Sequence, residues 1–158
     1  GKLMRPRIVD AIVAADGTVI RDYPPEVLNR VMKPDTSRKM RAALKTVTEP
    51  GGTATRGAVP GYTTGGKTGT AKKVKPAGGY YEGRYSVSFA GMVPAENPAF
   101  VCLVVVDDPQ TNEVKRYGGT IAAPIFTRIA ERAAKVMNIP PTEEVESDKE
   151  AAKQASIQ

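Results

Sequence analysis

The stretch of this 158-residue chain best equipped for chemistry is G-G-K-T-G-T-A at residues 65–71. Lys67 offers a cation, Thr68 and Thr70 offer hydroxyls, and glycines separate them from their neighbours. Threonine favours an extended chain, and glycine lets another backbone or an extended ligand approach closely. On a strand the two hydroxyls share one face, because side chains alternate. The segment therefore predicts a carboxylate-binding strand whose amide near Thr70 points at a developing oxyanion.

Two other interpretations of this segment remain open. Residues 61–68 satisfy the phosphate-loop pattern G-x-x-x-x-G-K-[ST], which would make the chain a nucleotide-binding fragment. That pattern requires a buried strand before it and a helix after it. Residues 51–60 are not an apolar strand, and Pro76 interrupts any helix that follows. The other alternative is a purely structural glycine-rich edge strand with a solvated lysine. For the chain as a whole, a non-catalytic binding module or a pseudoenzyme of the same fold is a further alternative.

Composition excludes several functional classes. The chain has no His and one Cys, which rules out Ser-His-Asp and Cys-His catalysis, His-ligated metals and Cys-based zinc clusters. No stretch approaches the roughly 18 apolar residues of a membrane-spanning helix, and no leader opens the chain. The net charge of +6 comes from dispersed basic residues without an aromatic stacking platform. It predicts a solvated basic surface and no nucleic-acid partner.

The first half of the chain shows hairpin and helix signals. The apolar run at 7–15, the Asp-Gly link and residues 18–20 predict a hairpin with both turn residues at positive φ and a largely buried first strand. Helical spacing predicts a helix over 35–48, with candidate N-caps at its first three residues. The Gly-, Thr- and Pro-rich segment 50–66 predicts an exposed loop.

The second half predicts a hairpin followed by a helix. Alternation over 85–93 predicts a strand, and the unbroken apolar run 100–106 predicts a central strand buried on both faces, with Cys102 as an apolar filler. A helix starting at Thr120 is expected to pack on the sheet through a stripe formed by Ile121, Ile125, Ile129, Ala133 and Val136. Hairpins dominate and no βαβ alternation is visible, which indicates an α+β fold with an antiparallel sheet flanked by helices.

Several motifs agree in order and spacing with one known family. Residues 66–73, G-K-T-G-T-A-K-K, resemble the Lys-Thr-Gly signature of serine penicillin-recognising enzymes. Further matching motifs are P-G-G-T-A at 50–54, G-R-Y at 83–85, S-F-A-G-M-V-P-A at 88–95, V-V-V-D-D-P at 104–109, Y-G-G at 117–119 and A-P-I-F at 123–126. Together they resemble the C-terminal part of a class B penicillin-binding protein, a division-type peptidoglycan D,D-transpeptidase. The resemblance covers residues 1–140, and 141–158 is expected to be a disordered tail.

This resemblance implies part of a penicillin-binding-protein transpeptidase domain, similar in fold to serine β-lactamases. In that family a Ser attacks a stem peptide ending in D-Ala-D-Ala, an amine resolves the acyl-enzyme, and β-lactams acylate the same Ser without metal or cofactor. Lys67, Thr68, Gly69 and Thr70 would bind the substrate, and the Thr70 amide would serve the oxyanion hole. Tyr117, Gly118 and Gly119 resemble a stretch near the site without an assigned catalytic role.

The chain lacks the rest of the family's catalytic set. None of its five Ser residues begins S-x-x-K or S-x-N, so the nucleophile and its base are expected upstream of Gly1 and the isolated segment is expected to be inactive. The expected partners are the missing N-terminal part of the domain, and cell-division and glycan-polymerising membrane proteins. The resemblance also implies an anchor in the cytoplasmic membrane outside this segment, with an extracytoplasmic catalytic domain.

Overall fold

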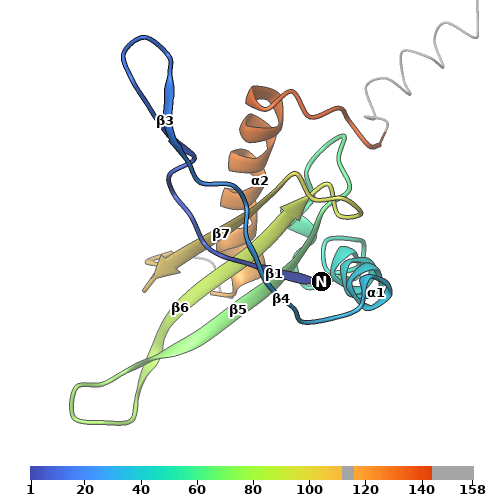
Figure 1. The fold of residues 1–158 in the computed structure, drawn as a ribbon. Helices are drawn as coiled ribbons and strands as arrows, with labels where there is room; N and C mark the ends of the chain where they lie inside the picture. The colour runs from blue at the N-terminus through green and yellow to red at the C-terminus, as the bar shows by residue number, and fades with distance from the viewer. Residues whose placement is uncertain (112–115, 144–158) are drawn as a thin grey trace, which may run out of the picture. The chain divides into compact units, whose positions relative to one another are not determined.

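The computed structural model describes residues 1–111 and 116–143, and Figure 1 shows its ribbon. The chain divides into two compact units, Gly1–Met40 and Arg41–Gln158. The elements in chain order are β1 (Lys2–Met4), β2 (Ala11–Val13), β3 (Val19–Asp22), β4 (Val27–Arg30), α1 (Pro34–Lys45), the 3-10 turn η1 (Thr55–Gly57), β5 (Gly65–Val74), β6 (Tyr80–Val93), β7 (Phe100–Asp107) and α2 (Gly118–Val136).

The first unit contains two short antiparallel pairs, β1 with β4 and β2 with β3. The predicted hairpin is present, but the prediction of a buried first strand is wrong, since Val13 is 53% exposed. A two-stranded ribbon has no second layer to cover it. The predicted turn is also wrong: Gly17 has φ +88° and Asp16 has no positive φ. The Ala14 carbonyl accepts from the Gly17 amide, giving a longer loop that ends on a left-handed glycine.

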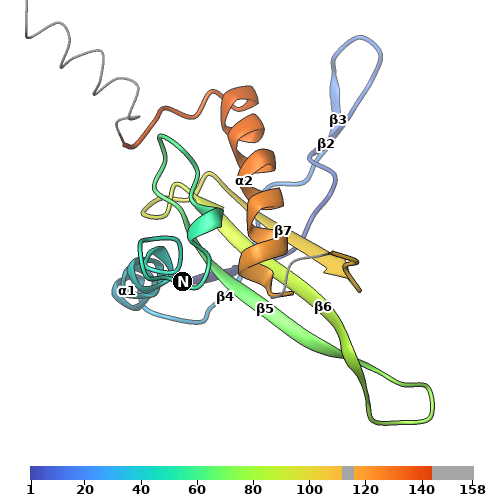
Figure 2. The ribbon, with the colours of Figure 1, turned by 180° about the vertical axis from the view of Figure 1, so that it is seen from behind.

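The second unit is built on a three-stranded antiparallel sheet in the order β5-β6-β7. Figures 1 and 2, seen from opposite sides, show α2 lying across one face of this sheet. The predicted α+β fold with an antiparallel sheet and helices is therefore confirmed. The strand predicted over 85–93 is present in β6, and Val87, Phe89 and Val93 on one of its faces are fully buried. The Phe89 and Phe126 rings pack edge to face with centroids 5.1 Å apart, joining sheet and helix.

Helix α2 uses a different face from the predicted stripe. Its buried residues are Gly118, Gly119, Ala122, Ala123, Phe126, Ala130 and Ala134. Ile125 and Ile129 are 40% and 45% exposed, so the prediction that they face the sheet is wrong. Small residues allow the helix to approach closely enough for the Phe126 ring to fill the space above Gly91, where an added methyl group would lie 2.4 Å from that ring. Close approach to the sheet, which small side chains permit, selects the buried face, and hydrophobicity alone does not.

The prediction of a central β7 buried on both faces is wrong for the described residues. β7 pairs only with β6 and forms an edge of the sheet. Val104 lies under α2 and is 8% exposed, whereas Val101, Leu103 and Val105 on the opposite face are 70%, 63% and 57% exposed. The strand is apolar on both faces, but the described chain covers one of them.

Two boundaries and one loop also differ from expectation. Helix α1 begins at Pro34, whose fixed φ suits a first helical position, so residues 35–37 lie inside its first turn and do not cap it. Segment 50–66 is not an exposed loop, because Ala54 and Val59 are 1% and 2% exposed in the core. Helix α2 begins at Gly118, and Thr120 contributes by accepting a hydrogen bond from the Tyr117 amide at 3.1 Å.

The segment after α2 is described as far as Glu143. The amides of Thr142 and Glu143 donate to the Gly61 carbonyl at 2.9 and 3.1 Å. The Tyr62 hydroxyl donates to the Ile139 carbonyl at 2.8 Å. These bonds tie 139–143 to the chain that leads into β5. The rest of the predicted tail, 144–158, lies outside the described residues.

Candidate functional site

The K-T-G-T segment lies fully extended in β5, as the sequence predicted. It pairs with β6 in the register Lys67 to Ala90, Thr68 to Phe89, Gly69 to Ser88 and Thr70 to Val87. The strand therefore presents the two threonines on the face of Phe89 and Val87, and Lys67 on the opposite face. Both hydroxyls lie together as predicted, and the cation stands on the other side of the same backbone.

An extended Lys67-Thr68 excludes the phosphate loop in the described structure. A phosphate loop ends in a helix whose first amides hold the anion. Here Lys67 and Thr68 sit in the middle of a ten-residue strand that continues to Val74. The nucleotide-binding alternative is therefore wrong.

The side chains of the segment keep donors available for a ligand. The Lys67 ammonium donates one hydrogen bond to the Thr68 carbonyl at 2.8 Å, which leaves further protons on the same nitrogen. The Thr70 hydroxyl oxygen accepts from the Gly118 amide at 3.4 Å, so its own proton remains available to donate. Lys67 and Thr70 are exposed, while Thr68 and Gly69 are half-buried. The segment can therefore offer an ammonium and a hydroxyl to an anion.

The N-terminus of α2 lies directly against this segment. A methyl group added at Gly118 would lie 2.1 Å from the Ser88 carbonyl oxygen and 2.8 Å from that of Gly69. At Gly119 it would lie 2.1 Å from the Thr53 carbonyl oxygen. Only glycine fits at these two positions, and the positive end of the helix dipole comes to lie beside Thr70. Sequence reasoning noted the Y-G-G motif but gave it no role; the packing requirement became visible only in three dimensions.

Three buried threonines hold the start of β5. Among the described residues, Thr48, Thr63 and Thr64 are the buried polar side chains, and all three lie at this point of the fold. Thr48 donates to the Thr64 carbonyl at 2.6 Å, and the Thr64 hydroxyl accepts from the Val59 amide at 3.1 Å. The Thr63 hydroxyl donates to the Glu96 carboxylate and accepts from the Ala95 amide at 3.1 Å. Sequence reasoning assigned none of these residues.

Lys45 and Glu96 extend this cluster toward the surface. The Lys45 ammonium pairs with the Glu96 carboxylate at 3.0 Å and lies 4.0 Å from Glu143. The hydrogen bond from Thr63, and after it the interaction with Lys45, hold the pKa of Glu96 below its ordinary value. The hydrogen bond with Glu96 in turn raises the pKa of Lys45. Both groups are therefore held in their charged forms.

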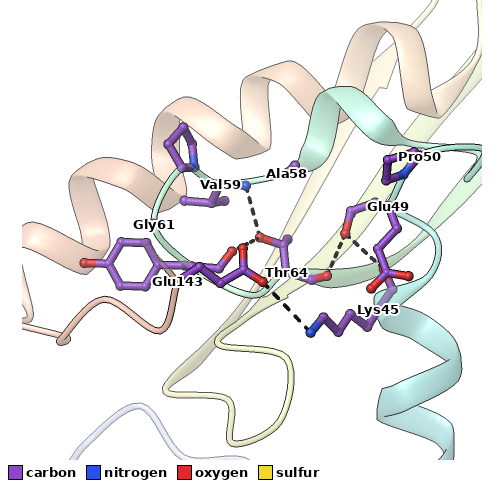
Figure 3. Close-up of a pocket in the computed structure, with 11 residues that line it drawn as sticks. Lys45, Glu49, Pro50, Ala58, Val59, Gly61, Thr64 and Glu143 are labelled. Atoms are coloured by element: carbon purple, nitrogen blue, oxygen red, sulfur yellow. Dashed lines mark hydrogen bonds and ion pairs between the residues drawn. The ribbon is translucent and has the colours of Figure 1, made fainter. Parts of the chain in front are cut away.

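A pocket of about 410 Å³ opens beside this cluster (Figure 3). It is lined by Lys45, Thr48, Glu49, Pro50, Ala58, Val59, Pro60, Gly61, Tyr62, Thr64 and Glu143. Its threonine hydroxyls are already bonded to backbone groups, and its ammonium is paired with carboxylates. These polar groups join α1, the 58–64 segment and the chain after α2, so the pocket has the character of a packing junction.

The site combines a K-T-G-T edge strand with the glycine-bearing start of α2, on an antiparallel sheet. This combination is the one expected of the penicillin-recognising transpeptidases. The family described as "Penicillin binding protein transpeptidase domain" matches residues 1–131. This chain belongs to that family. Within the family it corresponds to a C-terminal region of the transpeptidase domain in the class B proteins of the PBP3 and FtsI type, as the sequence predicted.

Individual relatives agree with this placement. The chain is 37% identical over 147 residues to penicillin-binding protein PbpB of Mycolicibacterium smegmatis, covering 89% of this chain and 22% of the relative. It is 39% identical over 126 residues to peptidoglycan D,D-transpeptidase FtsI of Escherichia coli, covering 80% and 21%. The structure of penicillin-binding protein 3 from Mycobacterium tuberculosis complexed with ampicillin superposes with a TM-score of 0.72 at 34% identity, covering 89% of this chain and 33% of that one.

The chain thus spans about a fifth of the length of these curated relatives. In the part of the chain that the structure describes, neither helix combines the length and apolar character needed to cross a bilayer. The same described residues contain no group of three or more acidic, His or Cys side chains placed to hold a metal ion.

Proposed function

We propose that this chain forms one wall of the acyl-transfer site of a peptidoglycan D,D-transpeptidase that also binds β-lactams. The observation that carries the proposal is the extended Lys67–Thr70 segment on an outer strand of the sheet, beside the start of α2. An edge strand can take an extended peptide alongside it through main-chain hydrogen bonds. The family relationship supplies the peptide: a stem peptide that ends in D-Ala-D-Ala.

Each residue of the segment has a defined task in this proposal. Thr68 and Thr70 bind the terminal carboxylate through hydroxyls on one face of β5. The Lys67 side chain leaves the other face and folds back to the Thr68 carbonyl, and its ammonium reaches the same carboxylate past the strand edge. The nearby helix terminus favours the same negative charge. Gly69 lets the substrate backbone approach the strand. The Thr70 amide donates to the carbonyl oxygen of the scissile bond as negative charge develops on it.

The reaction itself uses a Ser that this chain does not contain. The Ser oxygen attacks the carbonyl carbon of the penultimate D-alanine, and its proton passes by way of a base to the leaving amine as the C–N bond breaks. D-alanine departs, and an amine from a neighbouring stem peptide then attacks the acyl carbon and returns a proton to the Ser oxygen. A β-lactam acylates the same Ser when its amide bond opens. The mechanism requires no metal or organic cofactor.

The remainder of the transpeptidase domain is the first partner proposed for this chain. Two features of β7 support this. Among the described residues β7 pairs with β6 alone, and the side chains of Val101, Leu103 and Val105 on one of its faces are exposed, whereas a long apolar edge strand normally has a partner. That partner would bring the S-x-x-K and S-x-N motifs. In the complete protein, residues 1–140 would be the C-terminal portion of the domain, and 141–158 would follow it, with Thr142 and Glu143 hydrogen-bonded to the domain through Gly61.

The family relationship also suggests where the complete protein lies in the cell and which proteins it contacts. The complete protein would be anchored in the cytoplasmic membrane by a segment outside this chain, with its catalytic domain on the outer side. Its partners there would be cell-division and glycan-polymerising membrane proteins. The FtsI-type relatives motivate this division role.

The proposal is tested by acylation of the complete transpeptidase with a fluorescent penicillin. Lys67→Ala removes a charge-assisted contact worth about 1.5–3 kcal/mol, so we expect the acylation rate to fall roughly 10- to 100-fold with Tm nearly unchanged. Lys72→Ala, an exposed lysine on the same strand, is the matched control and should leave the rate unchanged. Equal rates for wild type and Lys67→Ala would refute the assigned role.

A second measurement separates a transpeptidase from a non-catalytic protein of the same fold. The isolated chain should form no covalent penicilloyl adduct by mass spectrometry, since it lacks S-x-x-K. A stoichiometric adduct on residues 1–158 alone would contradict that expectation. Failure of the complete protein to form an adduct would favour the binding-module alternative.

A further inference from the structure

The start of β5 is fixed by hydrogen bonds to four separate segments. Thr63 is the centre of this arrangement: its hydroxyl bonds to Glu96 and Ala95 in the β6–β7 turn, and its amide donates to the Thr142 hydroxyl at 2.8 Å. The Ala95 amide also donates to the Thr63 carbonyl at 3.0 Å. The neighbouring Thr64 connects to the end of α1 and to Val59.

Thr63 is thus only 7% exposed, and each of its polar groups has a hydrogen-bond partner. Its amide, its carbonyl and its hydroxyl are all engaged. A buried group with this many bonds has one favourable position, because moving it leaves several polar atoms unsatisfied away from water. The threonine therefore fixes the position at which the chain enters the sheet.

The two glycines between Thr64 and Lys67 connect this fixed position to the 67–70 segment. At Gly65 an added methyl group would lie 2.7 Å from the end of the Met92 side chain and in ordinary contact, at 3.4 Å, with the Leu44 carbonyl carbon of α1. At Gly66 a methyl group would lie 2.4 Å from the Phe89 ring and 2.6 Å from the Ala90 carbonyl oxygen. Both glycines are buried and paired in register with β6. Closely packed backbone cannot take up a displacement, so a shift at Thr63 moves Lys67 as well.

We propose that Thr63 and Glu96 are positioning residues for the acyl-transfer site. Neither side chain belongs to the 67–70 segment. They act by holding the start of β5, which sets where the Lys67 ammonium and the Thr70 amide and hydroxyl lie. This inference rests on the proposed function, because it assigns the cluster a role in that same site. Acyl transfer is sensitive to such placement, since a misplacement of about 1 Å can cost roughly 100-fold in rate.

Acylation kinetics and stability of the complete transpeptidase test the proposal together. Thr63→Val keeps the shape of the side chain but cannot bond to Glu96 or Ala95. We expect its β-lactam acylation rate, measured at least 15 °C below its own Tm, to fall about tenfold or more. Thr63→Ser restores the hydroxyl and should return the rate to within about threefold of wild type. Glu96→Gln retains an acceptor without the charge and should fall between the two.

Thr127→Val is the matched control. From the middle of α2, the Thr127 hydroxyl donates to the Arg56 carbonyl at 2.9 Å, and it shares no hydrogen bond with the 67–70 segment. This variant should lose comparable stability and keep the wild-type acylation rate. A Thr63→Val enzyme with wild-type kinetics, or a Thr127→Val enzyme with an equal kinetic loss, would overturn the proposal.

These measurements distinguish a failure of the positioning role of Thr63 from a failure of the proposed function of the 67–70 segment. If the 67–70 segment had no role, Lys67→Ala would acylate normally whatever Thr63 does. If Lys67→Ala is slow and Thr63→Val is normal, the site stands and its positioning by the buried cluster is wrong. If Thr63→Val fails to fold, Glu96→Gln decides the question against Thr63→Ser and wild type: equal acylation rates in wild type, Thr63→Ser and Glu96→Gln would refute the proposal.

Discussion

Replacing Gly118 with alanine is expected to separate the start of α2 from β5. The added methyl group would lie 2.1 Å from the Ser88 carbonyl oxygen and 2.8 Å from that of Gly69, both in paired strands. A carbon and an oxygen normally stay about 3.3 Å apart, so the helix must move outward by about 1.2 Å. Neither strand can yield readily, because each carbonyl belongs to backbone held in the sheet.

Two consequences follow from that displacement. Overpacking of this kind costs about 1–3 kcal/mol, which corresponds to a fall in Tm of several degrees. The displacement also breaks the bond from the Gly118 amide to the Thr70 hydroxyl, and it moves the helix dipole away from the proposed carboxylate site. We therefore expect acylation by a β-lactam in the complete transpeptidase to slow by about 10- to 100-fold.

Ala134→Gly provides a control of similar stability cost on the same helix. Ala134 is fully buried near the C-terminal end of α2, and its replacement costs about 1 kcal/mol in helix propensity and about 0.8 kcal/mol in lost burial. This variant should melt earlier and acylate normally. Thermal unfolding and acylation rates of both variants decide the matter: a Gly118→Ala enzyme with wild-type Tm and rate would refute the packing argument.

Three further predictions concern stability. Phe126→Ala removes the ring that joins α2 to the sheet and should lower the free energy of unfolding by about 3–5 kcal/mol in denaturant melts, whereas a smaller loss than for half-exposed Ile129→Ala would contradict the assigned core. Thr63 and Lys45 lower the pKa of Glu96, so its ionised form stabilises the fold at pH values above the unfolded pKa of about 4.5, and this contribution disappears as the pH falls through the lower folded pKa. Glu96→Gln should therefore lose less stability than wild type between about pH 5 and pH 3, and parallel curves would count against this account. Arg84→Gln removes the hydrogen-bond partner of the Asp108 carboxylate and should lower Tm measurably, with much of the loss recovered in the Arg84→Gln, Asp108→Asn double variant.

Local sequence patterns were sufficient to predict the extended conformation of residues 67–70 and of β6. Thr68 and Thr70 alternate with small residues, which fixes both the extended conformation and the shared face. The β6 alternation places Val87 and Phe89 toward a core, and no tertiary interaction opposes it. Period-two patterns of this kind report burial directly, because a shift by one residue would expose the whole apolar set.

Local sequence patterns could not show which face of α2 packs on the sheet. Its sequence carries two apolar stripes, one of isoleucines and one of alanines with Phe126. Hydrophobicity favours the isoleucines, but the sheet surface at Gly91 accepts a ring and leaves room only for small neighbours. The buried face therefore depends on the shape of the sheet surface at Gly91, which is distant from Phe126 in the sequence.

The sequence by itself determined the family, the K-T-G-T strand and the absence of an S-x-x-K nucleophile, because each is a property of residue types at short spacing. Tertiary structure alone decided what surrounds that strand. It placed Gly118 against the backbone of β5 and β6, and it gathered Thr63 and Glu96 at the start of β5. Such contacts join segments tens of residues apart, and their strength lies in close fit and satisfied buried hydrogen bonds, which no local pattern encodes.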